Sequence, residues 1–247
     1  MTWHAPNLPT DKHCFFDSHG GISKGIYKGL NVNTKSDDLI SNLSTNLEIT
    51  AQYFNLHLSN LHLLRQDVSS DVCYVSSPTQ DQIDADGAVT DQPNTILCIR
   101  TADCAPVLLA DYKHGIIGAA HAGWRGAYKG IIENTINLML QKGANTSDIA
   151  AAVGPCIAQS SYEVDNNFYQ TINQSQYFIS GQNNHWFFNL ESYCIDKLKH
   201  CGISNISASG IDTYPLANGY YSYRRMSHQN LINKPKCFPT EMSAIVL

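Results

Sequence analysis

The sequence predicts a mixed α+β fold in which helices pack against β-sheet. Short apolar runs of strand length recur along the chain, and other segments carry apolar residues at helical spacing. Strands and helices alternate too irregularly for a strict parallel βαβ arrangement, so we expect mixed sheets. Pro and Gly are spread along the 247 residues without a linker or an internal repeat, which predicts a single domain over residues 1–247.

The first expected elements are a helix and three strands. Ser36 or Asp37 is a candidate cap for a helix that carries Leu39, Leu43 and Leu47 on one face. Three apolar runs of strand length follow, at residues 96–100, 107–111 and 116–120.

A longer helix is expected over residues 126–142. Ile132, Ile136 and Met139 form an apolar stripe at helical spacing, and Gly143 marks the expected end. Two further elements complete the prediction, a helix over about 190–200 and a final apolar strand at 243–247.

The composition argues against several classes of partner. A formal net charge of −5 offers no basic footprint for nucleic acid. No run of eighteen apolar residues is present, so no membrane span is expected. The first residues lack a charged segment followed by an apolar one, as a secretory signal would have. We therefore expect a cytoplasmic protein.

Two side chains of catalytic type stand at the ends of apolar runs. Cys104 lies between a strand and Pro106, where a bend is expected, and His121 ends the next strand but one. Cys sulfur and His nitrogen are ligands that zinc prefers. They are equally the parts of a nucleophilic Cys–His pair, so both interpretations stay open.

A glycine-rich corner follows His121. Gly123 and Gly126 let the backbone turn tightly, and Arg125 would stand at the start of the next helix. Such a corner suits phosphate, carboxylate or a developing oxyanion. Taken singly, a buried thiol, a core histidine or a surface ion pair would explain Cys104, His121 and Arg125; their joint placement favours function.

The other histidines do not form the set of closely placed imidazoles that a multicopper centre needs. No role is expected for the six that lie in polar or loop-like segments, namely His4, His13, His114, His185, His200 and His228.

These motifs resemble the YfiH-type laccase-domain family, whose members carry names such as polyphenol oxidase, purine nucleoside phosphorylase and peptidoglycan editing factor. The most specific block is His-Ala-Gly-Trp-Arg-Gly at 121–126. Further matching blocks lie at 20–23, 30–31, 85–86, 101–107, 154–157, 162–164 and 222–225.

The resemblance implies a layered α/β/β/α domain with mixed sheets. It also implies zinc, replaced by copper in some family names, held by two His and one Cys with a fourth position open. The implied substrates are a purine nucleoside and phosphate, in phosphorolysis, with deamination of adenosine as a second activity. A metal with an open position activates water, and an Arg at a helix N-terminus holds phosphate.

Carried over by position, the resemblance assigns roles to individual residues. Metal ligands are expected at Cys104 and His121. Catalytic roles are expected for Cys104, His121, Arg125 and Asp103. Substrate binding is expected at Arg125, Asp86 and Arg224.

The chain departs from the family pattern at the first metal ligand. The expected histidine is Val68, and an aliphatic side chain cannot bind zinc. Asp67 or His62 is a possible substitute. Asp67 is one residue away, but a slip of one residue reverses the side-chain direction, so this rescue needs a bulge. Further departures lie at 16–18, Lys35, Leu47, Met226 and Glu241.

The sequence therefore predicts an enzyme of the purine nucleoside phosphorylase and adenosine deaminase type, with zinc on Cys104 and His121 and an anion on Arg125. Two alternatives follow from Val68: a metal-free Cys–His hydrolase of the peptidoglycan-editing type, or a catalytically silent family member.

Overall fold

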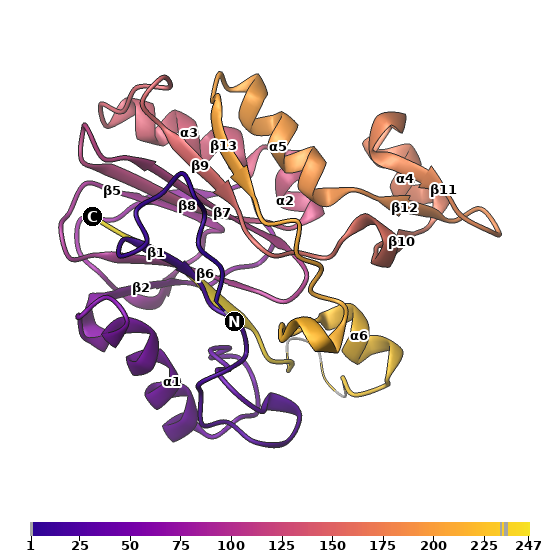
Figure 1. Ribbon diagram of the computed structural model, residues 1–247, viewed down its shortest axis with the longest axis horizontal. Coiled ribbons are helices and arrows are strands. Elements are labelled where there is room, and N and C mark those ends of the chain that lie inside the picture. Colours follow the sequence, from indigo (N-terminus) through magenta and orange to yellow (C-terminus); the bar gives the residue numbers. More distant parts are fainter. Residues whose placement is uncertain (1, 233, 235–236) are drawn as a thin grey trace.

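Two mixed β-sheets lie face to face between layers of helices (Figure 1), in a computed structural model that describes residues 2–232, 234 and 237–247. The smaller of the two has the order β1-β14-β6-β2-β4, and the larger β13-β9-β7-β8-β5-β3. Strands of the smaller sheet are β1 (His13–Phe15), β2 (Leu61–Leu64), β4 (Gln80–Ile83), β6 (Ile96–Thr101) and β14 (Glu241–Val246). Strands of the larger sheet are β3 (Val72–Tyr74), β5 (Gly87–Thr90), β7 (Ala105–Asp111), β8 (Ile116–Ala122), β9 (Ala150–Val153) and β13 (Asn205–Ala208).

Helices cover the outer face of each sheet, as Figure 1 shows with α1 below and α2, α3 and α5 above. The helices are α1 (Ile40–Gln52), α2 (Trp124–Lys129), α3 (Ile131–Gln141), α4 (Asn166–Ile172), α5 (Leu190–His200) and α6 (Tyr223–His228). A small third sheet has the order β10-β12-β11, with β10 (Glu163–Val164), β11 (Phe178–Ser180) and β12 (Trp186–Phe188). It projects with α4 at the right of Figure 1.

The central strands are apolar over most of their length because both of their faces are buried. In β6, Leu97 packs between the sheets, whereas Cys98 belongs to the core beneath α1. In β7, Leu108 packs between the sheets, whereas Leu109 belongs to the core beneath α3 and α5. The layered α/β/β/α fold with mixed sheets is thereby confirmed, and the expected strands are found as β6, β7 and β8.

Two expectations about helix ends were wrong. The first helix begins at Ile40, and the exposed Leu39 stands at its N-cap position. Ser36 and Asp37 do not cap it, because Ser36 donates to the Asn33 carbonyl and Asp37 pairs with Lys234. The long helix expected over 126–142 is two helices, α2 and α3. Gly130, with φ +96°, takes a left-handed conformation between them and breaks the ladder.

Within the described part of the chain, no helix combines the length and the apolar character needed to cross a membrane.

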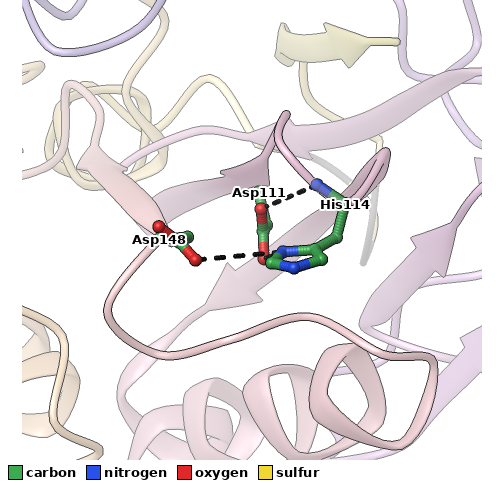
Figure 2. Close-up of side chains that lie close together, drawn as sticks. All are labelled: Asp111, His114 and Asp148. Atoms are coloured by element: carbon green, nitrogen blue, oxygen red, sulfur yellow. Dashed lines mark hydrogen bonds and ion pairs between the residues drawn. The ribbon is translucent and has the colours of Figure 1, made fainter.

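A buried carboxylate closes the turn between β7 and β8 (Figure 2). Asp111 accepts hydrogen bonds from the backbone N–H groups of His114 and Asn145, at 3.1 and 2.8 Å, and lies 2.7 Å from His114 Nδ1. Asp148 is 4.0 Å from His114 Nδ1 and 3.0 Å from Lys113 Nζ. Asp111, His114 and Asp148 are of types that could hold a metal ion. Because donors already engage both Asp111 oxygens, we interpret the group as a clamp that joins the turn to the loop after α3.

Replacing Asp111 tests this interpretation. In Asp111→Asn the amide NH₂ would face a backbone N–H, so we expect a loss of about 1–3 kcal/mol in the free energy of unfolding. Asp148→Asn, at the rim, should cost less than about 1 kcal/mol. Chemical denaturation measures both, with and without EDTA. Equal losses in the two variants, together with destabilisation of the wild type by EDTA, would indicate a metal site instead.

Candidate active site

The pairing of β7 with β8 brings Cys104 and His121 together. Ala105 pairs with Ala122, so Cys104, just before β7, lies beside Gly123, just after β8. A Cβ atom at Gly123 would lie 3.0 Å from Cys104 Sγ and 3.7 Å from His121 Nε2. The Cys104 and His121 side chains face each other closely enough for Cys104 to raise the pKa of the imidazole. A glycine is required here because any larger residue would intrude between the two functional groups.

The Asp86 carboxylate contacts both His121 and the loop that carries Val68. Asp86 precedes β5, and its Oδ1 lies 2.6 Å from His121 Nδ1. The same carboxylate accepts hydrogen bonds from the backbone N–H groups of Asp67, Val68 and Ser69, at 3.1, 3.1 and 2.7 Å. One buried side chain therefore orients the imidazole and fixes the 67–69 loop against it.

Electrostatics define the protonation state of the pair. Burial raises the pKa of Asp86, but its bonds to His121, Ser69 and Asp67 outweigh this and lower the pKa to about 2. An ionised carboxylate only accepts, so His121 Nδ1 carries a proton. Burial lowers the pKa of His121, whereas Cys104 and Asp86 raise it to about 10. The Asp86 carboxylate therefore favours the imidazolium form of His121.

Val68 lies beside the Cys104 and His121 side chains and completes a group of three, and we call its position the third corner of the site. Its Cγ1 would lie 3.2 Å from the same Cβ position at Gly123 that approaches Cys104 and His121. The backbone of Val68 has φ +58°, a left-handed conformation that is rare for β-branched residues. The loop thus directs the side chain of residue 68 toward the Cys–His pair, and in this chain that side chain is the isopropyl group of Val68.

The structure does not bring the two possible substitute ligands into a metal group with Cys104 and His121. His62 lies in β2, where its Nε2 is 3.8 Å from Cys73 Sγ and its Nδ1 accepts the Thr79 N–H at 3.1 Å. Asp67 lines the site. Among the described residues, however, the three-ligand group found is the Asp111 clamp, with ligand atoms within 4.8 Å of one another.

A cavity of about 460 Å³ opens beside the pair. The charged side chains that line it are Lys35, Arg100, Arg125, Arg224, Asp67 and Asp103. Uncharged side chains and the Cys–His pair also line the cavity, among them Cys104, His121, Tyr162, Thr101 and Thr240. Cationic groups thus outnumber carboxylates on the cavity wall, which favours an anionic or phosphate-bearing ligand.

Asp103 faces α6 and the loop before it. Its carboxylate accepts hydrogen bonds from Thr213 Oγ1, Ser222 Oγ and the Arg224 N–H, at 2.7, 3.0 and 2.7 Å. Burial raises the pKa of Asp103, and these donors act against it. Asp103 has φ +85°, which turns the chain sharply just before Cys104. These contacts point to a positioning role, in which Asp103 holds the Cys104 turn against α6.

The two predicted arginines both line the cavity. Arg125 is exposed, and its guanidinium carbon lies 4.6 Å above the Trp124 ring. Arg125 lies in the first turn of α2, which is only six residues long. The electrostatic support for an anion that a long helix would give is therefore absent at this point, and the positive charge comes from the guanidinium itself. Arg224 donates to the Glu163 carbonyl at 2.8 Å and lies 5.5 Å from the Tyr162 ring.

Sequence reasoning missed the cationic Arg100 and the hydroxyls of Thr101 and Thr240. Arg100 stands in an apolar strand and looked like part of the core pattern. A lone arginine in such a run was the available signal, because a buried cation needs a structural or functional reason.

Comparisons with known proteins support the family. The family model described as "Multi-copper polyphenol oxidoreductase laccase" matches residues 12–231. A purine nucleoside phosphorylase of Rickettsia prowazekii is 38% identical over 212 residues, which cover 82% of this chain and 83% of the relative. One from Rickettsia conorii is 42% identical over 169 residues, covering 66% and 68%. The solved structure of the YfiH protein of Bacillus licheniformis is 25% identical, with a TM-score of 0.86, covering 95% and 92% of the two chains.

Restoring a ligand at residue 68 tests the geometry of the third corner. His and Asn both tolerate left-handed backbone better than Val, so Val68→His and Val68→Asn should each stabilise the fold by about 1 kcal/mol. Only the imidazole supplies a zinc donor, so Val68→His should bind zinc at least about tenfold more tightly than wild type. Competition with a chromophoric chelator measures the affinity. If Val68→His and Val68→Asn bind zinc equally, residue 68 does not face the pair.

Acid sensitivity tests the role of Asp86. Its pKa is about 2 in the fold against 3.8 ordinarily. The stabilisation from the ionised form is therefore complete above pH 4 and is lost as the pH falls toward 2. The difference in unfolding free energy between wild type and Asp86→Asn should shrink by about 2 kcal/mol over that range. Asp84→Asn, on an exposed carboxylate that pairs with Arg65, is the control for a surface ion pair, and its cost should stay below about 1 kcal/mol. A pH-independent difference for Asp86→Asn would refute this role.

Proposed function

Because the chain belongs to the multi-copper polyphenol oxidoreductase laccase family and its Rickettsia relatives are named purine nucleoside phosphorylases, we propose that it cleaves purine nucleosides with phosphate. One observation carries the proposal. The Cys104–His121 pair and the cations Arg125 and Arg224 line the same cavity of about 460 Å³. This volume lies in the usual range for small-molecule sites.

The residues present do not fit the zinc that the family resemblance implies. Cys104 and His121 are zinc-type donors, and Asp86 on His121 Nδ1 is the outer-shell partner such a ligand normally has. The third corner, however, is the isopropyl group of Val68, and a catalytic zinc needs three protein ligands. The cavity also presents one imidazole, that of His121, whereas a multicopper centre needs several. No step below therefore uses a metal.

Phosphorolysis can be written with side chains alone. Cations on the cavity wall hold phosphate, and one phosphate oxygen attacks the ribose C1′. The C1′–O bond forms as the bond from C1′ to the purine nitrogen breaks, and the departing base takes the electron pair. His121, protonated and held by Asp86, donates a proton to the base as a general acid, and the proton that monohydrogen phosphate loses on becoming the ester dianion restores His121. Ribose 1-phosphate and the free purine are the products.

Adenosine deamination, the second activity that the resemblance implies, needs an activated water at the purine ring. The residues present give no step for it, so phosphorolysis is the activity that we propose.

Turnover of inosine with inorganic phosphate tests the proposal. We expect hypoxanthine and ribose 1-phosphate by chromatography, from protein purified without added zinc and containing far less than one zinc per chain by mass spectrometry. His121→Ala should lower kcat/KM at least about 100-fold, since it removes the general acid. Cys201→Ala, at a half-buried cysteine outside the cavity, should leave turnover unchanged.

The same assay separates the other possibilities. Stoichiometric zinc in the purified protein would show that another group replaces the lost ligand, and conversion of adenosine to inosine would reveal a deaminase. Absence of any nucleoside turnover, with or without zinc, would refute the proposal.

A second candidate rests on the spatial order Cys104–His121–Asp86, in which Asp86 is hydrogen-bonded to His121 and Cys104 lies on the other side of the imidazole. A thiol, an imidazole and an orienting carboxylate are the parts of a cysteine nucleophile, which would suit hydrolysis of a peptide-like amide. This candidate predicts rapid alkylation of Cys104 by iodoacetamide, faster than that of Cys201, and amide hydrolysis that Cys104→Ser abolishes. Slow alkylation of Cys104 would count against a cysteine nucleophile and would favour a catalytically silent protein over a hydrolase.

A further inference from the structure

A row of aromatic rings connects two arginines of the cavity wall. The rings of Trp124, Phe168 and Tyr162 contact in that order, with centroids 4.4 Å apart for the first pair and 6.0 Å for the second. The guanidinium carbon of Arg125 lies 4.6 Å from the Trp124 ring, and that of Arg224 lies 5.5 Å from the Tyr162 ring. Both arginines and Tyr162 line the cavity, so the two cations stand at the two ends of one aromatic row beside it.

Tyr162 offers an unused phenol O–H in this part of the cavity. Among the residues that the structure describes, this O–H has no hydrogen-bond partner. Its oxygen is not enclosed, in contrast to the phenol oxygen of Tyr112, which is buried and likewise unpaired within the described chain. Burial and the neighbouring Cys104 raise the pKa of Tyr162, so the group is a neutral O–H donor at neutral pH.

The small β10-β12-β11 sheet and α4 hold this phenol in place. Tyr162 directly precedes β10, and its carbonyl accepts the Phe188 N–H at 3.0 Å. Its ring meets Phe168 of α4 and Phe188 of β12 edge to face, at 6.0 and 5.8 Å. Arg224 is bound to the same strand, because it donates to the Glu163 carbonyl at 2.8 Å. The projecting sheet thereby forms part of the cavity wall and positions a hydroxyl and a guanidinium on it.

Within the described part of the chain, no carboxylate pairs with the guanidinium of Arg125 or of Arg224. The Asp103 carboxylate is engaged by hydroxyls and by the backbone N–H of Arg224, as described above. Asp67 also lines the cavity, on the loop that carries Val68, without an ion pair to either arginine. The charges of both guanidinium groups are therefore available to a ligand.

We propose that Tyr162 binds the phosphate co-substrate together with Arg125 and Arg224, with its phenol O–H donating to a phosphate oxygen. The inference rests on the proposed phosphorolysis and refines it. Two guanidinium groups, which only donate, and a neutral O–H donor suit the oxygens of a phosphate dianion better than they suit the neutral ribose.

Removal of the phenol oxygen tests the contact. Tyr162→Phe keeps the ring that packs on Phe168 and Phe188 and deletes the O–H, so the midpoint of thermal unfolding should not change. Binding of inorganic phosphate should weaken about tenfold or more, the effect of losing one hydrogen bond to a charged group. Tyr112→Phe is the matched control, because it deletes a phenol oxygen outside the cavity and should leave phosphate binding unchanged.

Removal of charge tests the two arginines. Arg125→Gln and Arg224→Gln should each weaken phosphate binding about tenfold or more, since each deletes a charge-assisted contact. Lys129→Gln removes the same formal charge from an exposed residue of α2 outside the cavity. It should leave phosphate binding within about twofold of wild type, because an exposed charge at a distance is screened.

Isothermal titration of the intact chain with inorganic phosphate measures binding, alone and with hypoxanthine, a base that cannot react with phosphate. Weaker phosphate binding in Tyr162→Phe and in both arginine variants, with both controls unchanged, supports the subsite even if inosine is never turned over. Unchanged phosphate binding in Tyr162→Phe, or none in the wild type, overturns it. A raised KM for inosine with an unchanged KM for phosphate also overturns it, and would assign Tyr162 to the nucleoside while leaving the phosphorylase proposal intact.

Discussion

The carboxylate of Asp86 is the interaction on which the geometry of the site depends. It connects three parts of the chain that are distant in sequence: the start of β5, the end of β8 and the 67–69 loop. The loop contributes only backbone N–H groups to this contact, so its path does not depend on which side chain residue 68 carries. The loop would therefore turn toward Cys104 and His121 whichever side chain residue 68 carries.

The exchange at residue 68 changes the chemistry more than the structure. A metal would compete for His121 Nε2 and Cys104 Sγ and keep the imidazole neutral. With an isopropyl group in the third corner, His121 interacts with Cys104 and with the Asp86 carboxylate, and both raise its pKa. Under the proposed function this corner acts as a proton donor instead of a set of metal donors. The cations of the cavity keep their positions, since Arg100 and Arg224 bond to backbone carbonyls away from Val68.

Local patterns in the sequence sufficed for the central strands and for the pairing of Cys104 with His121. Strands β6, β7 and β8 are apolar on both faces, and α5 begins and ends where its pattern predicts. The break at Gly130 was missed because the apolar stripe of Ile132, Ile136 and Met139 lies wholly after it and does not indicate where that helix begins. The small β10–β12 sheet was also missed, since its strands are two or three residues long and carry no usable period. The contacts of Asp103 and Thr240 depend on partners more than a hundred residues away, which no local pattern reveals.

Energetically unfavourable features gather around the cavity. Val68 and Asp103 hold left-handed backbone conformations that cost non-glycine residues about 1–3 kcal/mol each, and Thr101 and Thr240 bury unpaired hydroxyls. The central strands of the core show the opposite character, with apolar packing on both faces. A chain that had lost every function could relax such costs by single substitutions, for example a glycine at residue 68 or valine at residues 101 and 240. Their concentration around one cavity is the pattern expected of a site shaped for a ligand, which agrees with the proposed function.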